Sequence, residues 1–197
     1  MAVNLVSRVQ KLLMSPKTEW DAIDTEQTDV MGILTTYVAP LVILGAVASL
    51  LGMLIFGINV GYGIVIKPPI TSLLIQAVIS IVLGVGMVYV FAFIIDMLAP
   101  SFGAQKNFNQ AFKVAAYAPT AAWVAGIAQI VPVIGWIVVL AGAIYTLYLL
   151  FVGLPKLMKP PADKGTVYTL ACIGVAIVLA IVVGFIVSRV AGGMMMR

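Results

Sequence analysis

The chain has 197 residues, of which 63% are hydrophobic and 9% are charged. Soluble globular domains carry about 25% charged residues, so this composition excludes that class. The net charge of +4 comes from 11 thinly spread lysines and arginines. That spread excludes nucleic acid as a partner, because nucleic-acid-binding proteins gather basic residues in patches. Long apolar segments between short polar ones instead predict an all-α, polytopic membrane protein in contact with the lipid bilayer.

Residues 1–30 are expected to form a cytoplasmic amphipathic segment. They are not a signal peptide, because the first strong hydrophobic run begins only near Ile33. One face of a short predicted helix carries the apolar residues Leu5, Val6, Val9, Leu12 and Leu13. We assign Arg8 and Lys11 to the opposite face. The pattern predicts a helix that either lies on an anionic membrane surface or packs on the protein's own membrane domain.

A second short helix is expected in "SPKTEWDAI", where Ser15 can cap and Pro16 suits the first helical position. Trp20 is predicted to be an interfacial anchor at the level of the lipid headgroups. The acidic stretch that ends at Asp29 has no apolar period and is expected to be a solvated connector.

Five membrane helices are predicted in a membrane domain that covers residues 31–190, followed by a short external tail at 191–197. Their approximate ranges are 33–56, 70–98, 112–130, 136–154 and 167–188. Each is roughly long enough to cross the hydrocarbon at 1.5 Å per residue. Pro100 is expected to end the second helix and Pro155 the fourth, because proline lacks the amide proton that a helix needs.

The basic residues predict the orientation of this five-helix bundle. Eight of them fall on the side of the N-terminus: Arg8, Lys11, Lys17, Lys106, Lys113, Lys156, Lys159 and Lys164. Three fall on the other side: Lys67, Arg189 and Arg197. The excess predicts a cytoplasmic N-terminus and an external C-terminus.

Small residues recur four positions apart, the spacing that lets helix backbones approach closely in lipid. The rows are Ala118, Ala122 and Gly126; Ala176, Ala180 and Gly184; and Ala48 with Gly52. They indicate either a compact bundle or the face of a homo-oligomer.

The inventory of reactive side chains argues against an enzyme. The chain has no histidine, the commonest general base and metal ligand. Its single cysteine, Cys172, excludes an internal disulfide, and five of its seven acids crowd into residues 19–29. We therefore predict no catalytic residue, no cofactor and no metal site.

Asp96 is the only acid inside a predicted span. An ionisable side chain there is a candidate ion or proton site, or a partner for a lysine. It also lies about one turn from Pro100, so its carboxylate can simply reach the cytoplasmic headgroups. We favour this second interpretation.

The third predicted helix carries Tyr117, Pro119 and Trp123. Pro119 removes one backbone hydrogen bond and is expected to kink the helix, which either shapes a transport cavity or merely fits the bundle. We favour the structural interpretation. Gln129, near the far end, is isolated and is expected to be interfacial.

A short apolar turn, "IVPVIGW", separates the third and fourth helices. Pro132 and Gly135 are expected to form a hairpin between antiparallel neighbours. Trp136 is expected to be its interfacial anchor.

Several stretches together resemble the Yip family (Ypt-interacting proteins), in its short prokaryotic-type form. They are "SPKTEWDAI", "FGAQKNFNQAFKVAAYAPTAAWVAGI" and "LLFVGLPKLMKPP". The resemblance implies a five-helix membrane domain with a cytoplasmic N-terminus and an external C-terminus. Eukaryotic relatives bind Rab-type GTPases, but no D-L-x-G-P-like signature precedes the first helix here. A Rab-type GTPase is therefore not an expected partner.

The leading hypothesis is a non-enzymatic integral membrane protein of the Yip type, in a bacterial inner (plasma) membrane, that organises or partners other membrane components. Its partners would be other membrane proteins or further copies of itself. The alternative is a small transporter, channel or lipid-translocating protein that uses Asp96 and the kinked third helix.

Overall fold

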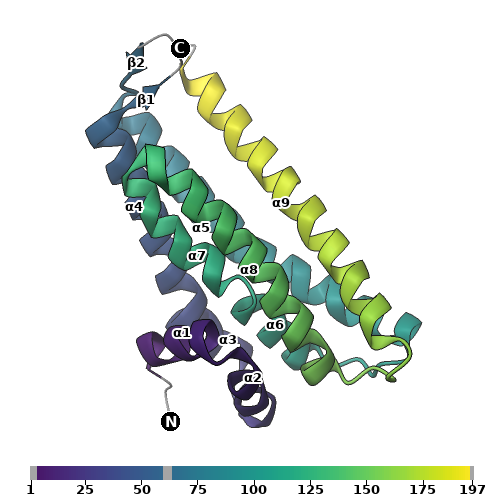
Figure 1. The fold of residues 1–197 in the computed structure, drawn as a ribbon. Helices are drawn as coiled ribbons and strands as arrows, with labels where there is room; N and C mark the ends of the chain where they lie inside the picture. The colour runs from purple at the N-terminus through teal and green to yellow at the C-terminus, as the bar shows by residue number, and fades with distance from the viewer. Residues whose placement is uncertain (1–3, 60–63, 196–197) are drawn as a thin grey trace.

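The structure is a computed structural model that describes the backbone of residues 4–59 and 64–195 (Figure 1). The side chains of residues 58–59, 132–133 and 190–195 lie outside the described part. The side chain of Pro132 is one of these, so the structure gives only its backbone.

Two short helices form the end of the molecule at which the described chain starts (Figure 1). Helix α1 covers Leu5–Met14 and begins where the side chain of Asn4 accepts a hydrogen bond from the amide of Val6, 3.0 Å away. Helix α2 covers Pro16–Thr25, with proline at its first position, where no helical amide donor is needed. We call α1 and α2 together the N-terminal cap.

Four helices among the described residues are long and apolar enough to cross a membrane. The first combines α3 (Val30–Ile33), the π-helix η1 (Leu34–Val38) and α4 (Ala39–Phe56). The others are α5 (Ile70–Leu98), continued by the 3₁₀-helix η2 (Ala99–Phe102), then α8 (Pro132–Met158) and α9 (Gly165–Met195). The protein is therefore an all-α, polytopic membrane protein.

The π-helix in the first span has a local cause. Pro40 lies two positions beyond η1 and has no amide hydrogen, so the regular hydrogen-bond ladder is interrupted there. Wider π-turns are a common way to absorb such an interruption. The helix continues to Phe56, the end expected for the first span.

A small antiparallel ribbon, which the sequence did not predict, joins α4 to α5. Strand β1 is Ile58–Asn59 and strand β2 is Val65–Ile66, with Ile58 opposite Ile66. Gly57 turns the chain into it with φ of +70°, where an added Cβ would lie 2.8 Å from the carbonyl oxygen of Ile66. Only glycine fits this turn without strain.

The third predicted helix, 112–130, is not one helix. The segment divides into α6 (Phe108–Tyr117), α7 (Thr120–Gly126) and the 3₁₀-helix η3 (Ile127–Ile130). Pro119 was expected to kink a continuous helix; instead, two turn residues there separate α6 from α7. The cause is the missing amide of Pro119, whose own ψ of 1° lies outside the helical range.

The fourth helix is longer than predicted at both ends. Pro132 is its first residue, and Pro155, expected to end it, lies inside the last turn. The helix continues because the carbonyl of Pro155 still accepts a hydrogen bond, at 3.1 Å, from the amide of Lys159. It stops at Lys159, whose φ of 47° is left-handed. Gly135 was expected in the hairpin between the two helices, but it lies inside α8, in its first helical turn. A Cβ added to Gly135 would lie 2.7 Å from the carbonyl oxygen of Ala128.

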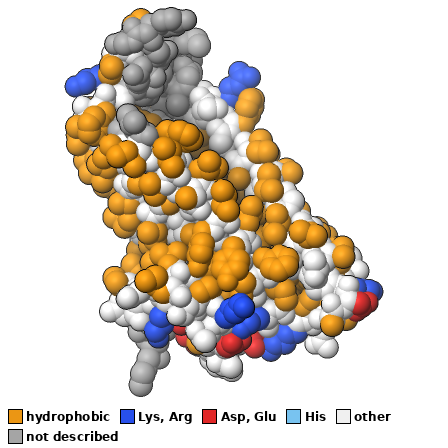
Figure 2. All heavy atoms as spheres, in the orientation of Figure 1, with side chains coloured by type: hydrophobic (Ala, Val, Ile, Leu, Met, Phe, Trp, Pro, Cys, Tyr) orange, Lys and Arg blue, Asp and Glu red, His pale blue; other side chains and the backbone are white. Residues whose placement is uncertain are grey.

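Close packing joins α4, α7, η3 and α8, whereas α9 leans away from them toward its C-terminal end (Figure 1). An added Cβ on Gly142 of α8 would lie 2.7 Å from the carbonyl oxygen of Ala121. In contrast, nothing lies within 4 Å of a Cβ added to Gly184 of α9. Apolar side chains cover the middle of the visible face, and charged ones gather mainly at the cap end (Figure 2).

Candidate functional site

The side chain of Arg8 is buried, which corrects the sequence prediction. It was assigned to the polar face of the first helix, but it is 2% exposed. The reason lies in the helical period: Arg8 is three residues after Leu5 and four before Leu12, so all three share a face. Its Nη1 donates to Oε1 of Glu19 at 2.6 Å, and its Nη2 donates to Glu26.

Charge pairing keeps this buried guanidinium ionised. Burial by itself would lower the pKa of Arg8, but the hydrogen bond to Glu26 and the negative charges of Glu26 and Glu19 outweigh it and raise that pKa. The guanidinium carbon also lies 5.4 Å from the centre of the Tyr117 ring, a cation–π distance. Arg8 therefore links α1 to α2, to the residue that follows α2, and to α6.

A second buried cation holds α6 against α2. The ammonium of Lys113 donates to the carbonyl oxygens of Ile23, at 3.0 Å, and Glu26, at 2.6 Å. One helical turn earlier, Nε2 of Gln110 donates to Oδ1 of Asp24 at 2.9 Å. These contacts tie the N-terminal cap to a segment about 90 residues away in the sequence.

Trp20 lies inside the protein and not at its surface. Its side chain, predicted to contact lipid headgroups, is 0% exposed. It packs on Gly153 of α8 and makes an edge-on contact with the Tyr117 ring, with centroids 6.5 Å apart. The indole thus joins the cap to the bundle. Trp136, the other predicted anchor, is 63% exposed near the start of α8.

Tyr117 and Pro119 lie beside this cluster at the break between α6 and α7. The Tyr117 ring is 5% exposed and packs against Tyr37, with centroids 4.7 Å apart. The hydroxyls of Tyr37 and Thr120 are 2.7 Å apart, and Thr120 also donates to the carbonyl of Tyr117 at 2.5 Å. These bonds satisfy polar groups at the interruption that Pro119 creates. Tyr37 and Thr120 were not predicted from the sequence, because no local pattern indicates that residues 83 positions apart are in contact.

Asp96 is half-buried near the end of α5 and apart from the cluster around Arg8. Its Oδ1 has no hydrogen-bond partner among the described residues. The neighbouring Ile95 carbonyl accepts a hydrogen bond from the hydroxyl of Tyr168 at 2.5 Å. The proposed roles of Asp96, as an ion or proton site or as a carboxylate that reaches the headgroups, stay predictions.

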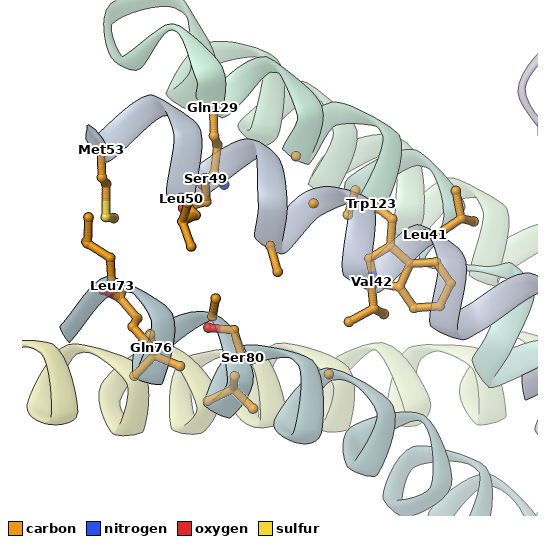
Figure 3. Close-up of a pocket in the computed structure, with 18 residues that line it drawn as sticks. Leu41, Val42, Ser49, Leu50, Met53, Leu73, Gln76, Ser80, Trp123 and Gln129 are labelled. Carbon is orange, nitrogen blue, oxygen red and sulfur yellow. The ribbon is translucent and has the colours of Figure 1, made fainter. Parts of the chain in front are cut away.

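A cavity of about 480 Å³ lies between the membrane helices. On α5 it is lined by residues between Leu73 and Gly84, in the half of the helix that follows β2. Its walls come from α4, α5, α9 and the segment formed by α7 and η3. Ser49 and Gln129 lie on one wall, with Gln76 and Ser80 across from them (Figure 3). Trp123 lies at one end, beside Leu41 and Val42 (Figure 3).

The cavity brings together only some of the residues that the sequence analysis singled out. Trp123 and Gln129 line it, but Asp96, Tyr117 and Pro119 are not among its lining residues. Gln129 was expected to be isolated, but it lines the cavity together with Ser49, Gln76 and Ser80. Sequence analysis did not find Gln76, although a neutral polar side chain inside a long apolar run is a visible signal.

In the part of the chain that the structure describes, no three histidine, cysteine or acidic side chains gather where they could hold a metal ion. In comparisons with known proteins, a family model described as the Yip1 domain matches residues 11–184. No curated protein and no solved structure matches the chain.

Proposed function

We propose that this chain, which belongs to the Yip1 domain family, is a non-enzymatic integral membrane protein that binds other membrane components through its N-terminal cap. The observation that carries the proposal is the buried pairing of Arg8 with Glu19 and Glu26. These pairs hold α1 against α2, while Lys113 of α6 and Gly153 of α8 contact the cap and fix it to the bundle. A cap fixed in this way presents a preorganised outer surface for binding. The partners would be other membrane proteins, including further copies of this chain.

The proposed topology has five crossings, with the cap in the cytoplasm of a bacterial cell and the C-terminus outside its inner membrane. The third crossing would consist of α6, α7 and η3, because these elements return the chain from the end of α5 to the start of α8. A broken helix is tolerated at membrane depth when it is buried in protein. Residues 111–118 are all buried, which supports this crossing.

The exposed surface of the cap fits a recognition role. Lys17 is exposed there, and Lys156 of α8 pairs with Asp21 of α2 beside it. Mixed charges on a fixed surface favour orientation and selection of a partner more than raw affinity. Charged side chains of both signs gather at this end of the molecule (Figure 2).

Site-specific crosslinking in living cells tests the proposal. A photoreactive amino acid replaces Lys17 on the cap or Lys67 at the opposite end, both of which are exposed. We expect a discrete, reproducible adduct from position 17 that disappears when Arg8→Met separates α1 from α2 and disturbs the surface of the cap. Equal adducts from position 67, or an adduct that survives Arg8→Met, would contradict binding through the cap.

The alternative, transport or lipid translocation, has one observation in its favour, the cavity between the membrane helices. Its lining residues do not include Asp96, so a route through that carboxylate has no support from the cavity. Liposomes containing the purified full-length chain should leak ions and move lipid no faster than protein-free liposomes. Faster flux would replace the binding role with transport.

A further inference from the structure

The cavity between α4 and α5 combines an apolar wall with a few polar groups. Its volume of about 480 Å³ is within the range of roughly 300–1,000 Å³ that small-molecule sites occupy. Leu50, Met53 and Leu73 supply apolar surface on both sides (Figure 3). Such a site suits a ligand that is mostly hydrocarbon.

Four neutral polar side chains interrupt this apolar surface at the depth of the membrane helices. Gln76 and Ser80 lie one turn apart on α5, and Ser49 and Gln129 lie opposite them (Figure 3). None of the four makes a side-chain hydrogen bond to another residue that the structure describes; Ser49, Gln76 and Ser80 are half-buried and Gln129 is exposed. A polar group left unpaired in hydrocarbon is unfavourable, so these side chains need a partner from outside the chain.

The charge of the lining selects the class of partner. No lysine, arginine, aspartate or glutamate is among the lining residues in the described part of the chain. A charged headgroup would therefore enter without a counter-charge, which is unfavourable at membrane depth. Water alone could pair with the polar groups but would leave the apolar surface wet. A neutral amphiphile satisfies both kinds of surface.

We infer that this cavity binds a neutral lipid of the diacylglycerol type, with its ester and hydroxyl oxygens at Gln76, Ser80, Ser49 and Gln129 and an acyl chain along the apolar walls. The amides and hydroxyls of these side chains supply donors to the lipid oxygens. This site is separate from the cap and does not depend on the partner-binding function proposed above.

Photolabelling of the full-length protein tests the inference. The protein is placed in phosphatidylcholine nanodiscs with a trace of diacylglycerol that carries a diazirine on one acyl chain, and labelled residues are mapped by mass spectrometry. We expect labels on cavity residues such as Met53 and Trp123, competed by excess diacylglycerol. Phosphatidic acid with the same chains should compete about tenfold less well, because its charge has no partner in the cavity.

Two glycines provide a matched pair of variants. An added Cβ meets nothing within 4 Å at either Gly45 or Gly174, but only Gly45 lines the cavity. Gly45→Leu should fill the space and lower competable labelling about tenfold, whereas Gly174→Leu should leave it unchanged. Equal labelling in both variants would overturn the inference.

A third variant keeps the test decisive if Gly45→Leu does not fold. Gln76→Leu keeps a side chain of similar size but removes the polar amide. We expect competition by diacylglycerol to weaken about fivefold, as the loss of a single hydrogen bond predicts. Labels scattered over the exposed face of α9, competition by phosphatidic acid equal to that by diacylglycerol, or no effect of Gln76→Leu would each overturn the assignment.

Discussion

The cap end and the cavity end of the bundle treat their polar side chains in opposite ways. At the cap, Arg8 and Glu19 are almost fully buried and pair with each other at 2.6 Å. At the cavity, Gln76 and Gln129 face open space and make no side-chain hydrogen bond to a described residue. The polar side chains of the cap are charged and buried against one another, whereas those of the cavity are neutral and line an open space.

The difference follows from what each kind of group requires. A buried charge without its partner is strongly destabilising, so the residues around Arg8 must stay together in the folded state. A neutral amide or hydroxyl is less demanding and can exchange one external partner for another. Stability is therefore expected to depend on the cap, and ligand exchange on the cavity.

The largest expected effect comes from removing the central charge of the cap. Arg8→Met leaves Glu19 buried without its partner and should lower the free energy of unfolding by about 3–5 kcal/mol. Lys11→Met, on the exposed side of the same helix, should change it by no more than about 0.5 kcal/mol. Denaturant unfolding in detergent measures both. Equal effects would mean that the buried pairs do not hold the cap.

The next effect concerns the contact between the cap and α8. A Cβ on Gly153 would lie 2.5 Å from Cζ2 of Trp20, so Gly153→Ala should displace the indole at about 1–3 kcal/mol. Gly174→Ala on α9 has open space for its Cβ and serves as the control. Thermal unfolding with tryptophan fluorescence reports both stability and exposure of the indole. A variant as stable as the control would refute the close packing.

A smaller effect is expected where the first span meets the break after α6. Tyr37→Phe removes the hydrogen bond to Thr120, and Thr120→Val removes the same bond from the other side. A double-mutant cycle should give a coupling free energy of about 0.5–1.5 kcal/mol. A coupling near zero would show that this bond does not support the interrupted helix.

The smallest effect on the free energy of unfolding is expected for a substitution in the cavity. Gln76→Leu removes no side-chain bond to a described residue, so the free energy of unfolding should change by at most about 0.5 kcal/mol. The same substitution at Gln110, which bonds to Asp24 at the cap, should lower it by about 1–3 kcal/mol. Chemical denaturation compares the pair. A larger loss at Gln76 would reverse the assigned roles.

The membrane-spanning helices follow from the sequence because their cause is local. Helix α5 occupies 70–98, the expected range, since a long apolar run between prolines has few alternatives in lipid. The segment 112–130 is different: its apolar character predicts a span, but whether Pro119 kinks or breaks the helix depends on its neighbours. Thr120 and Tyr37 supply hydrogen bonds there that no local pattern reveals.

The two candidate sites were harder to predict, for different reasons. Arg8 was assigned by its charge and not by its spacing from Leu12, and its partners Glu19 and Glu26 lie beyond a turn of the chain. The helical period gave a signal for its face, but nothing in the sequence showed the pairing. The cavity depends on how segments around Ser49, Gln76 and Gln129 are spaced, which only tertiary packing determines.

The long-range bonds of the cap also fix the order of events during synthesis. Residues of the cap leave the ribosome before their partners: Leu13 bonds to a tyrosine 132 positions later and Lys17 to a lysine 139 positions later. At about 5–20 residues per second, these partners are made on the order of ten seconds afterwards. The cap can therefore make its final contacts only after α8 has been synthesised. Until then, the indole of Trp20 lacks the surface at Gly153 on which it packs.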